Sequence, residues 1–191
     1  MKIEIISGST REASITKRVA LHLYTTLRQA TPHEVGLIDL SQWELPFVTT
    51  VFTSIDNTPE NFRPLAKRMF EADAFVLVTP EYNGSYSPAL KNLLDHFPKQ
   101  HHKAFGLVTA SPGGFGGMRA AQQLLNLVPA LFGLASPYLL IVPAVDKKFN
   151  AQGGLVDENF QHSIHNFISE FLWLAEKTAS PQMHPELQLV P

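Results

Sequence analysis

A regular alternation of short apolar segments with longer segments of helical periodicity constrains the fold most strongly. Ala74–Thr79 (AFVLVT) is apolar at nearly every position. A strand that is apolar on both sides must be covered on both faces of its sheet, which is typical of parallel sheets. The alternation therefore predicts an α/β fold with right-handed crossover helices on both faces. The expected strands are Lys2–Ser7, His33–Leu40, Ala74–Thr79, Ala104–Ala110 and Tyr138–Val142.

Five helical segments separate or follow these strands. Ser14 is expected to cap a helix that ends near Ala30 and carries apolar residues every four positions, at Ile15, Val19, Leu23 and Leu27. Thr58 and Pro59 are typical of a helix start, and they follow a long, turn-rich loop, Ser41–Asn57. The other expected helices are 88–96, 117–132 and 159–177. Residues 1–180 are expected to form a single domain, and residues 181–191 a C-terminal tail.

The composition excludes several classes of function. The chain has 191 residues, a formal net charge of −2 and no cysteine. Disulfides, thiolate nucleophiles and iron–sulfur ligation are therefore excluded, and no basic block suggests nucleic-acid binding. There is no signal-like start and no apolar run of about eighteen residues, so we expect a cytoplasmic protein with no membrane span. Charged residues make up only 17%, which suggests that subunits bury part of the surface.

The segment after the first strand is rich in hydroxyl side chains. Residues 7–16 read SGSTREASIT and lie just before a helix start. The free N–H groups and the dipole of a helix start favour an anion, and Arg11 can add charged donors. A phosphate monoester is the expected ligand; the alternative is an ordinary helix cap with a solvent-exposed Arg11. The Walker pattern and the dinucleotide fingerprint are both absent.

The segments after the third and fourth strands are also unusual. Residues 80–88 read PEYNGSYSP, and a flat heteroaromatic ring could lie against this backbone; the alternative is an Asn-Gly turn with tyrosines packed on a neighbouring subunit. Residues 111–117 read SPGGFGG, which leaves backbone amides open to close approach by a ligand; a flexible linker is the alternative. Because ligands of parallel sheets bind beyond the carboxyl ends of the strands, the fold predicts that all three segments form one site.

These segments resemble those of the NAD(P)H-dependent FMN reductase family, which includes chromate and quinone reductases and some azoreductases. The resemblance spans essentially the whole chain. The sequence differs from the family pattern at Ser87-Pro88-Ala89, where many members have Pro-Gly, and at Ser111-Pro112. The matching residues are Gly8-Ser9-Thr10-Arg11 with Ser14, Pro80-Glu81-Tyr82-Asn83, Leu90-Lys91-Asn92 with Asp95, and Gly113, Gly114, Gly116 and Gly117 with Arg119-Ala120.

The resemblance implies a flavodoxin-like, doubly wound, five-stranded parallel sheet in the order 2-1-3-4-5, with helices on both faces. It implies that FMN is the cofactor and that NADPH or NADH is the co-substrate. It implies no catalytic side chain, because the flavin carries the chemistry. The implied cofactor-binding residues are Ser9, Arg11, Ser14, Ile15 and Thr16 at the phosphate, Pro80, Glu81, Tyr82, Asn83 and Gly84 at the ring, and Ser111, Gly113 and Gly114 at its other edge.

The implied function is electron transfer from NAD(P)H through bound FMN to a small acceptor, such as a quinone, an azo compound, a metal oxyanion or free flavin. A flavodoxin-type electron carrier and a non-catalytic FMN-binding module stay open as alternatives. The physiological acceptor and the preferred nucleotide are not specified by the sequence.

A homodimer or homotetramer is expected from the resemblance. The helix after Pro88 offers an apolar face for it, and Trp43 is a candidate to reach a neighbouring subunit's pocket. No metal site is expected, because neither His101-His102 nor the pair His162 and His165 has a further ligand nearby in sequence. The residues of the expected interface are Tyr86, Leu90, Leu93, Leu94 and Phe97.

Overall fold

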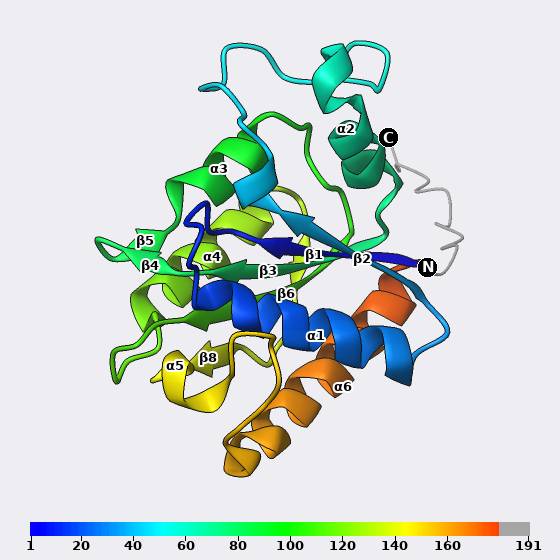
Figure 1. Ribbon diagram of the computed structural model, residues 1–191. Helices are drawn as coiled ribbons and strands as arrows, with labels where there is room; N and C mark the ends of the chain where they lie inside the picture. Colours follow the sequence, from blue (N-terminus) through cyan, green and yellow to red (C-terminus); the bar gives the residue numbers. More distant parts are fainter. Residues whose placement is uncertain (180–191) are drawn as a thin grey trace, which may run out of the picture.

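The computed structural model describes residues 1–179, so the expected tail of residues 181–191 lies outside the described residues. Its centre is a parallel sheet in which the strands run side by side in the order β2-β1-β3-β6 (Figure 1). Two short strands, β7 and β8, share the next position and both pair with β6. The strand order predicted from the resemblance is confirmed. The strands are β1 (Lys2–Ser7), β2 (Glu34–Asp39), β3 (Ala74–Thr79), β6 (Ala104–Ala110), β7 (Leu134–Ala135) and β8 (Leu140–Val142).

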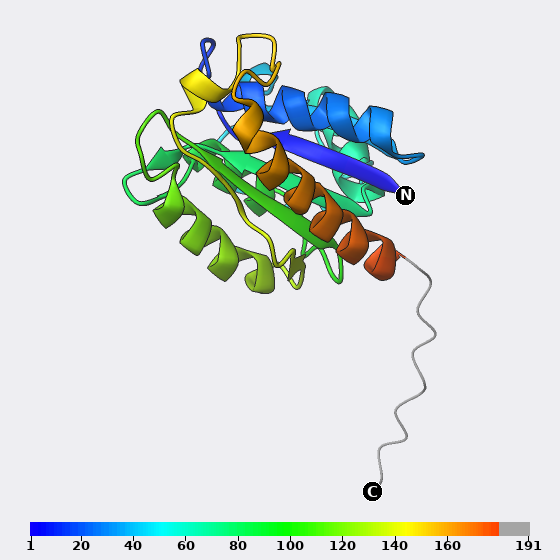
Figure 2. The same ribbon diagram turned by 90° about the horizontal axis from the view of Figure 1, so that it is seen from below.

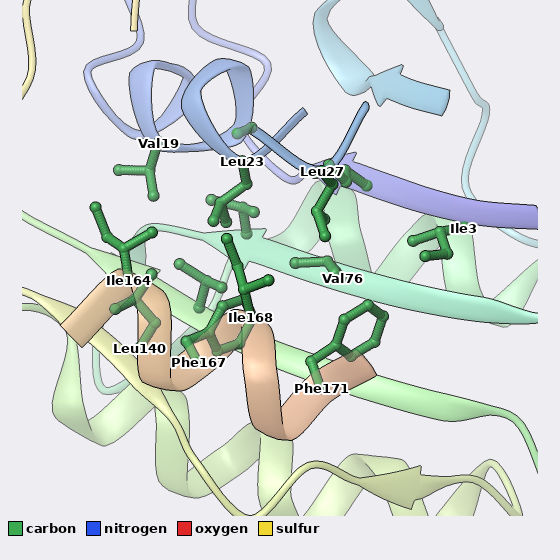
Figure 3. Close-up of a cluster of buried hydrophobic side chains, with 14 of the residues drawn as sticks. Ile3, Val19, Leu23, Leu27, Val76, Leu140, Ile164, Phe167, Ile168 and Phe171 are labelled. Atoms are coloured by element: carbon green, nitrogen blue, oxygen red, sulfur yellow. The ribbon is translucent and has the colours of Figure 1, made fainter. Parts of the chain in front are cut away.

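Helices cover both faces of the sheet. Helices α1 (Thr16–Ala30) and α6 (Gln161–Ala179) pack on one face through a buried apolar cluster (Figure 3). A second cluster joins the opposite face to α2 (Arg63–Glu71), α3 (Pro88–Asp95) and α4 (Met118–Ala130). Figure 2 shows α1 and α6 lying together along the strands.

Strand β3 shows why the sheet needs both layers. All six of its residues are buried, and the first five alternate between the two clusters. Val76 and Val78 contact the α1–α6 cluster, whereas Phe75 and Leu77 contact the other. The expectation of a strand covered on both faces is confirmed.

The register of the strands brings their carboxyl ends to one edge. Ser7 of β1 pairs with Val78 of β3, and Thr79 pairs with Thr109 of β6. Because these parallel strands end level with one another, the segments that follow them start side by side. This edge lies at the left of Figure 1, where the small hairpin of β4 (Glu81–Tyr82) and β5 (Ser85–Tyr86) projects.

Two expected elements differ in detail. Helix α2 begins at Arg63, after a 3₁₀ turn, Glu60–Phe62, and Thr58 does not cap it, since its hydroxyl donates to the Ser54 carbonyl at 2.8 Å. The fifth strand, expected at Tyr138–Val142, is shorter, because β8 covers only Leu140–Val142, and a second short strand, β7, which was not expected, lies beside β6 as well. Pro137 lies between β7 and β8 and has no N–H to give to a strand ladder. The remaining short elements are 3₁₀ turns η1 (Leu40–Gln42) and η3 (Glu158–Phe160) and helix α5 (Val145–Lys148).

The apolar face expected to join subunits is used inside the chain. Leu90 and Leu93 of α3 are fully buried, and Leu94 and Phe97 are nearly so, all in the second core cluster. Tyr86 is partly buried against the same cluster. Because the four buried side chains cover the sheet of their own chain, the prediction that they form a subunit interface is wrong, and for Tyr86 it stays a prediction.

No helix among residues 1–179 is long and apolar enough to span a bilayer.

Candidate functional site

The segments after β1, β3 and β6 meet around one cavity of about 250 Å³. The level strand ends bring them together, as the sequence predicts. Nine predicted residues line the cavity: Ser9, Arg11, Ser14, Ile15, Thr16, Pro80, Glu81, Tyr82 and Ser111. Ala13, Ala110 and Pro112 also line it and were missed; Ala110, the last residue of β6, could have been found from its place beside Ser111 at the strand end.

The first segment is fixed to the neighbouring strand at Gly8. The Gly8 N–H donates to the Val78 carbonyl at 2.7 Å, and the Ser87 hydroxyl donates to the Gly8 carbonyl. A Cβ at Gly8 would lie 3.0 Å from the Val78 oxygen, so this close approach favours glycine. Ser87 also accepts a hydrogen bond from Leu90 N and so caps α3. One hydroxyl thus ties the first segment to the start of α3.

The start of α1 presents unpaired backbone donors to the cavity. Ser14 Oγ accepts from Lys17 N at 3.2 Å, so this residue has the capping role expected of it. Among the described residues, nothing accepts a hydrogen bond from the N–H groups of Ile15 and Thr16. Helix-start amides of this kind bind anions, because no partner exists for them within the helix. Ser9, which is buried, adds a hydroxyl beside them.

Arg11 is the only cationic side chain among the described residues that line this cavity. Its guanidinium carbon lies 5.0 Å from the centre of the Tyr82 ring, within range of a cation–π interaction. This contact joins the first segment to the second across the mouth of the cavity. Arg11 itself is exposed, so its charge remains available to a ligand.

The nearby Lys17 is already paired with a carboxylate. Its ammonium lies 2.5 Å from Asp39 Oδ2 at the end of β2. Burial alone would raise the pKa of Asp39, but the bonds from Lys17 and Ser41 outweigh burial and hold that pKa below its ordinary value. Lys17 therefore anchors α1 to the sheet, and Arg11 supplies the charge that faces the cavity.

The second segment forms the β4–β5 hairpin. Tyr82 pairs with Ser85, and the two residues between them, Asn83 and Gly84, have φ values of 51° and 82°. Positive φ at both positions is what a two-residue type I′ hairpin turn requires, and Asn-Gly is its preferred pair. The Asn-Gly turn weighed as the alternative is thus present. Asn83 and Gly84 lie at the hairpin tip and do not line the cavity.

Glu81 connects this hairpin to the third segment. Its carboxylate accepts from the Arg119 backbone N–H at 3.2 Å, and it lies 3.9 Å from the Arg119 guanidinium. Glu81 thus holds the hairpin against the first turn of α4. The two segments expected to border a ring are therefore linked by a side chain and not only by the sheet.

The glycines of the third segment have different roles. Gly116 and Gly117 have φ values of 60° and 87° and pack closely against β8 and β6. The Gly113 carbonyl accepts from Gly116 N and Ala144 N, both at 3.3 Å. A Cβ at Gly114 would have nothing within 4 Å. The predicted residues Gly113 and Gly114 do not line the cavity, although Ser111 and Pro112 next to them do.

A second cavity, of about 380 Å³, lies on the other side of the first segment. Thr10 borders it, as do Trp43 and Phe47 from the loop after β2 and Pro88 and Asn92 of α3. Trp43 therefore lines a pocket of its own chain. In residues 1–179, no group of three His, Cys, Asp or Glu side chains is arranged to hold a metal ion.

Comparison with known proteins identifies the family of the chain. Residues 1–144 match the family model for NADPH-dependent FMN reductase. An FMN-dependent NADPH-azoreductase of Staphylococcus aureus is 32% identical over 182 residues, covering 90% of this chain and 94% of that protein.

Solved structures show the same fold. FerB, a flavoenzyme NAD(P)H:(acceptor) oxidoreductase from Paracoccus denitrificans, superposes with a TM-score of 0.77 at 23% identity, covering 93% of this chain and 98% of its own. A flavodoxin variant from Pseudomonas aeruginosa gives 0.55 at 20% identity, covering 90% and 99%. The matched residues include all three segments that build the cavity. The chain belongs to the NADPH-dependent FMN reductase family.

Proposed function

We propose that this chain holds FMN in the 250 Å³ cavity and uses it to pass electrons from a reduced nicotinamide nucleotide to a small acceptor. Family membership makes the chain an FMN-dependent NAD(P)H oxidoreductase. The assignment of the cofactor to this cavity rests on one observation: Arg11 and the residues with unpaired amides, Ile15 and Thr16, line the same cavity. The acceptor classes we propose are quinones, azo compounds, metal oxyanions and free flavin.

The donors at the helix start fit the phosphate of FMN. The residues that line the cavity supply two unpaired backbone N–H groups, the hydroxyls of Ser9 and Thr16 and the Arg11 guanidinium. A phosphate dianion there would gain charge-assisted hydrogen bonds together with the positive end of the α1 dipole. Ser14 would contribute less directly, because its hydroxyl already accepts from Lys17 N.

The apolar residues of the cavity fit a flat ring. Pro80, Tyr82 and Pro112 supply apolar walls from two different strand ends. Glu81 links these two strand ends through the hydrogen bond that its carboxylate accepts from the Arg119 backbone N–H. When bound, FMN would supply the redox chemistry, accepting a hydride from a nicotinamide and passing electrons to the acceptor. The chain's own residues would orient the ring and exclude water from one of its faces.

An absorption spectrum of the purified protein with FMN, followed by anaerobic addition of NADPH and then NADH, tests the proposal. We expect a yellow protein whose flavin absorbance is lost on mixing with at least one nucleotide and returns on addition of an acceptor. A flavodoxin-type carrier or a non-catalytic FMN-binding module would bind FMN but would not be reduced directly. A protein that binds no FMN would contradict the site.

We also propose a homodimer or homotetramer in the cytoplasm, where reduced nicotinamide nucleotides are supplied. The support for oligomerisation comes from the segment after β2, because Phe47 is 91% exposed and Val48 and Val51 are also exposed. Apolar side chains exposed together in this way are typical of interaction surfaces.

A further inference from the structure

A third cavity, of about 290 Å³, opens beside the proposed ring site. It is lined by Glu81, Phe115, Met118 and Arg119. Glu81 lines the proposed FMN cavity too, so the two spaces meet at this residue. A molecule in the third cavity would therefore lie next to the ring-bordering hairpin.

Apolar side chains form one wall of this cavity. Phe115 is 82% exposed and Met118 is 48% exposed, although both are large and hydrophobic. Glycines flank Phe115 on both sides, and the rest of the loop is fixed by the bonds to the Gly113 carbonyl. A planar aromatic molecule could cover Phe115 and Met118, which would remove their apolar surface from water.

Arg119 adds a positive charge to the same cavity. Its side chain is 82% exposed, and its guanidinium approaches a carboxylate, that of Glu81, only to 3.9 Å. At that distance and exposure the ion pair is weak. The Arg119 stem packs on the hairpin turn, since its Cδ lies 3.7 Å from the position a Cβ would take at Gly84. The guanidinium is thereby held at the cavity with most of its donors directed to solvent.

We infer that this cavity is the acceptor subsite and that Arg119 is a specificity-determining residue, which favours planar aromatic acceptors carrying a carboxylate or sulfonate. The inference rests on the proposed function, because an acceptor needs a reduced flavin beside it. An anionic substituent would form charge-assisted hydrogen bonds with the guanidinium, and the aromatic body would lie on Phe115. Neutral acceptors would bind through the apolar wall alone.

A matched pair of azo acceptors tests this inference. One is 4-dimethylaminoazobenzene, which is neutral, and the other is methyl red, the same molecule with a carboxylate on one ring. The measured quantity is the ratio of kcat/KM for the anionic acceptor to kcat/KM for the neutral one. We expect Arg119→Gln to lower this ratio about tenfold, the size of a lost charge-assisted hydrogen bond. Arg119→Lys should recover part of it. Phe115→Ala should raise KM for both acceptors by similar factors.

The control variant is Lys67→Gln, which removes the same charge from α2, where Lys67 lines none of the described cavities and lies 4.0 Å from Glu71. It should leave the ratio unchanged. An unchanged ratio in Arg119→Gln overturns the inference, even if KM for NADPH rises in that variant. Stopped-flow reduction of the FMN-loaded protein by NADPH distinguishes a failure of the proposed function from a failure of this inference. If the wild type is not reduced, the proposed function is contradicted. If the wild type is reduced normally and the kcat/KM ratio of Arg119→Gln is unchanged, only the role of Arg119 is contradicted.

Discussion

Gly116 lies where a side chain has no room. A Cβ there would lie 2.7 Å from Ile141 Cγ2 and 2.7 Å from the backbone N of Pro143. Its φ of 60° is also one that residues with a side chain rarely adopt. Gly114, two positions earlier, has open space around it. The two glycines have similar sequence surroundings but differ in the space around them, because β8 packs against only Gly116.

Replacing Gly116 with Ala should therefore destabilise the fold. The clash and the positive φ together should lower the free energy of unfolding by about 1–3 kcal/mol. Gly114→Ala, the matched control, should change it by less than about 0.5 kcal/mol. Urea unfolding followed by circular dichroism measures both. Equal effects in the two variants would contradict the close packing of Gly116 on β8.

Replacing Arg11 with Ala should weaken FMN binding. The loss of a charge-assisted hydrogen bond to the phosphate should cost about 1.5–3 kcal/mol. Quenching of flavin fluorescence on titration gives the Kd. Arg28→Ala, which removes an exposed arginine from the other end of α1, is the control and should leave the Kd unchanged. An unchanged Kd in Arg11→Ala would show that the phosphate lies elsewhere.

At the scale of elements, residues 149–157 form a strap across α1. Arg18 donates to the Phe149 carbonyl at 3.0 Å, and His22 Nδ1 lies 3.0 Å from the Gly153 carbonyl. Because a carbonyl can only accept, His22 Nδ1 must carry the proton. Its Nε2 is buried with no hydrogen-bond partner among the described residues.

This geometry predicts an acid sensitivity of the strap. Burial lowers the pKa of His22 below its ordinary value of 6.5, although the bond to Gly153 opposes the shift. At pH values above 6.5 the His22 ring is neutral in both the folded and the unfolded chain. Below that value the unfolded chain takes up a proton first, so the free energy of unfolding falls as the pH falls toward the folded-state pKa.

His22→Gln should flatten this part of the pH dependence, because glutamine stays neutral. Urea midpoints measured above and below pH 6.5 would give the size of the effect. His165→Gln on α6 removes an exposed histidine and should keep the wild-type slope. The same slope in His22→Gln and the wild type would count against the buried neutral ring.

The strands were predictable from the sequence because each is a short apolar run that must be buried. The start of α2 was not, because Thr58 and Pro59 have the composition of a helix start, whereas the Thr58 hydroxyl bonds back to Ser54 in the preceding turn. The short strand β7 was likewise not expected, because its two residues are too few to form a recognisable apolar run.

The lining of the candidate cavity was largely predictable because its residues follow strand ends. Within the Gly-rich segment, sequence alone could not separate glycines that pack closely from those that face open space, as Gly116 and Gly114 show. The apolar face of α3 was misjudged for a similar reason. Leu90 and Leu93 fit an interface and a core equally well, and only the position of the sheet decides between them.

For the whole molecule, we expect light scattering after gel filtration to give at least twice the chain mass of 21.2 kDa. Phe47→Ser should shift the assembly toward the monomer, because it removes the most exposed aromatic side chain of the segment after β2. Val156→Ser, which removes an exposed apolar side chain from the strap, is the control. A monomer mass for the wild type at micromolar concentration would contradict the proposed oligomer.

The two short strands beside β6 have a consequence for solubility. An uninterrupted outer strand offers a row of free N–H and carbonyl groups on which another polypeptide can add, and this is one route to aggregation. Here β7 has two residues and β8 has three, with Pro137 between them. Strands of two and three residues are too short to template a further strand. The sheet edge formed by β7 and β8 should therefore resist ordered self-association even when the protein is concentrated.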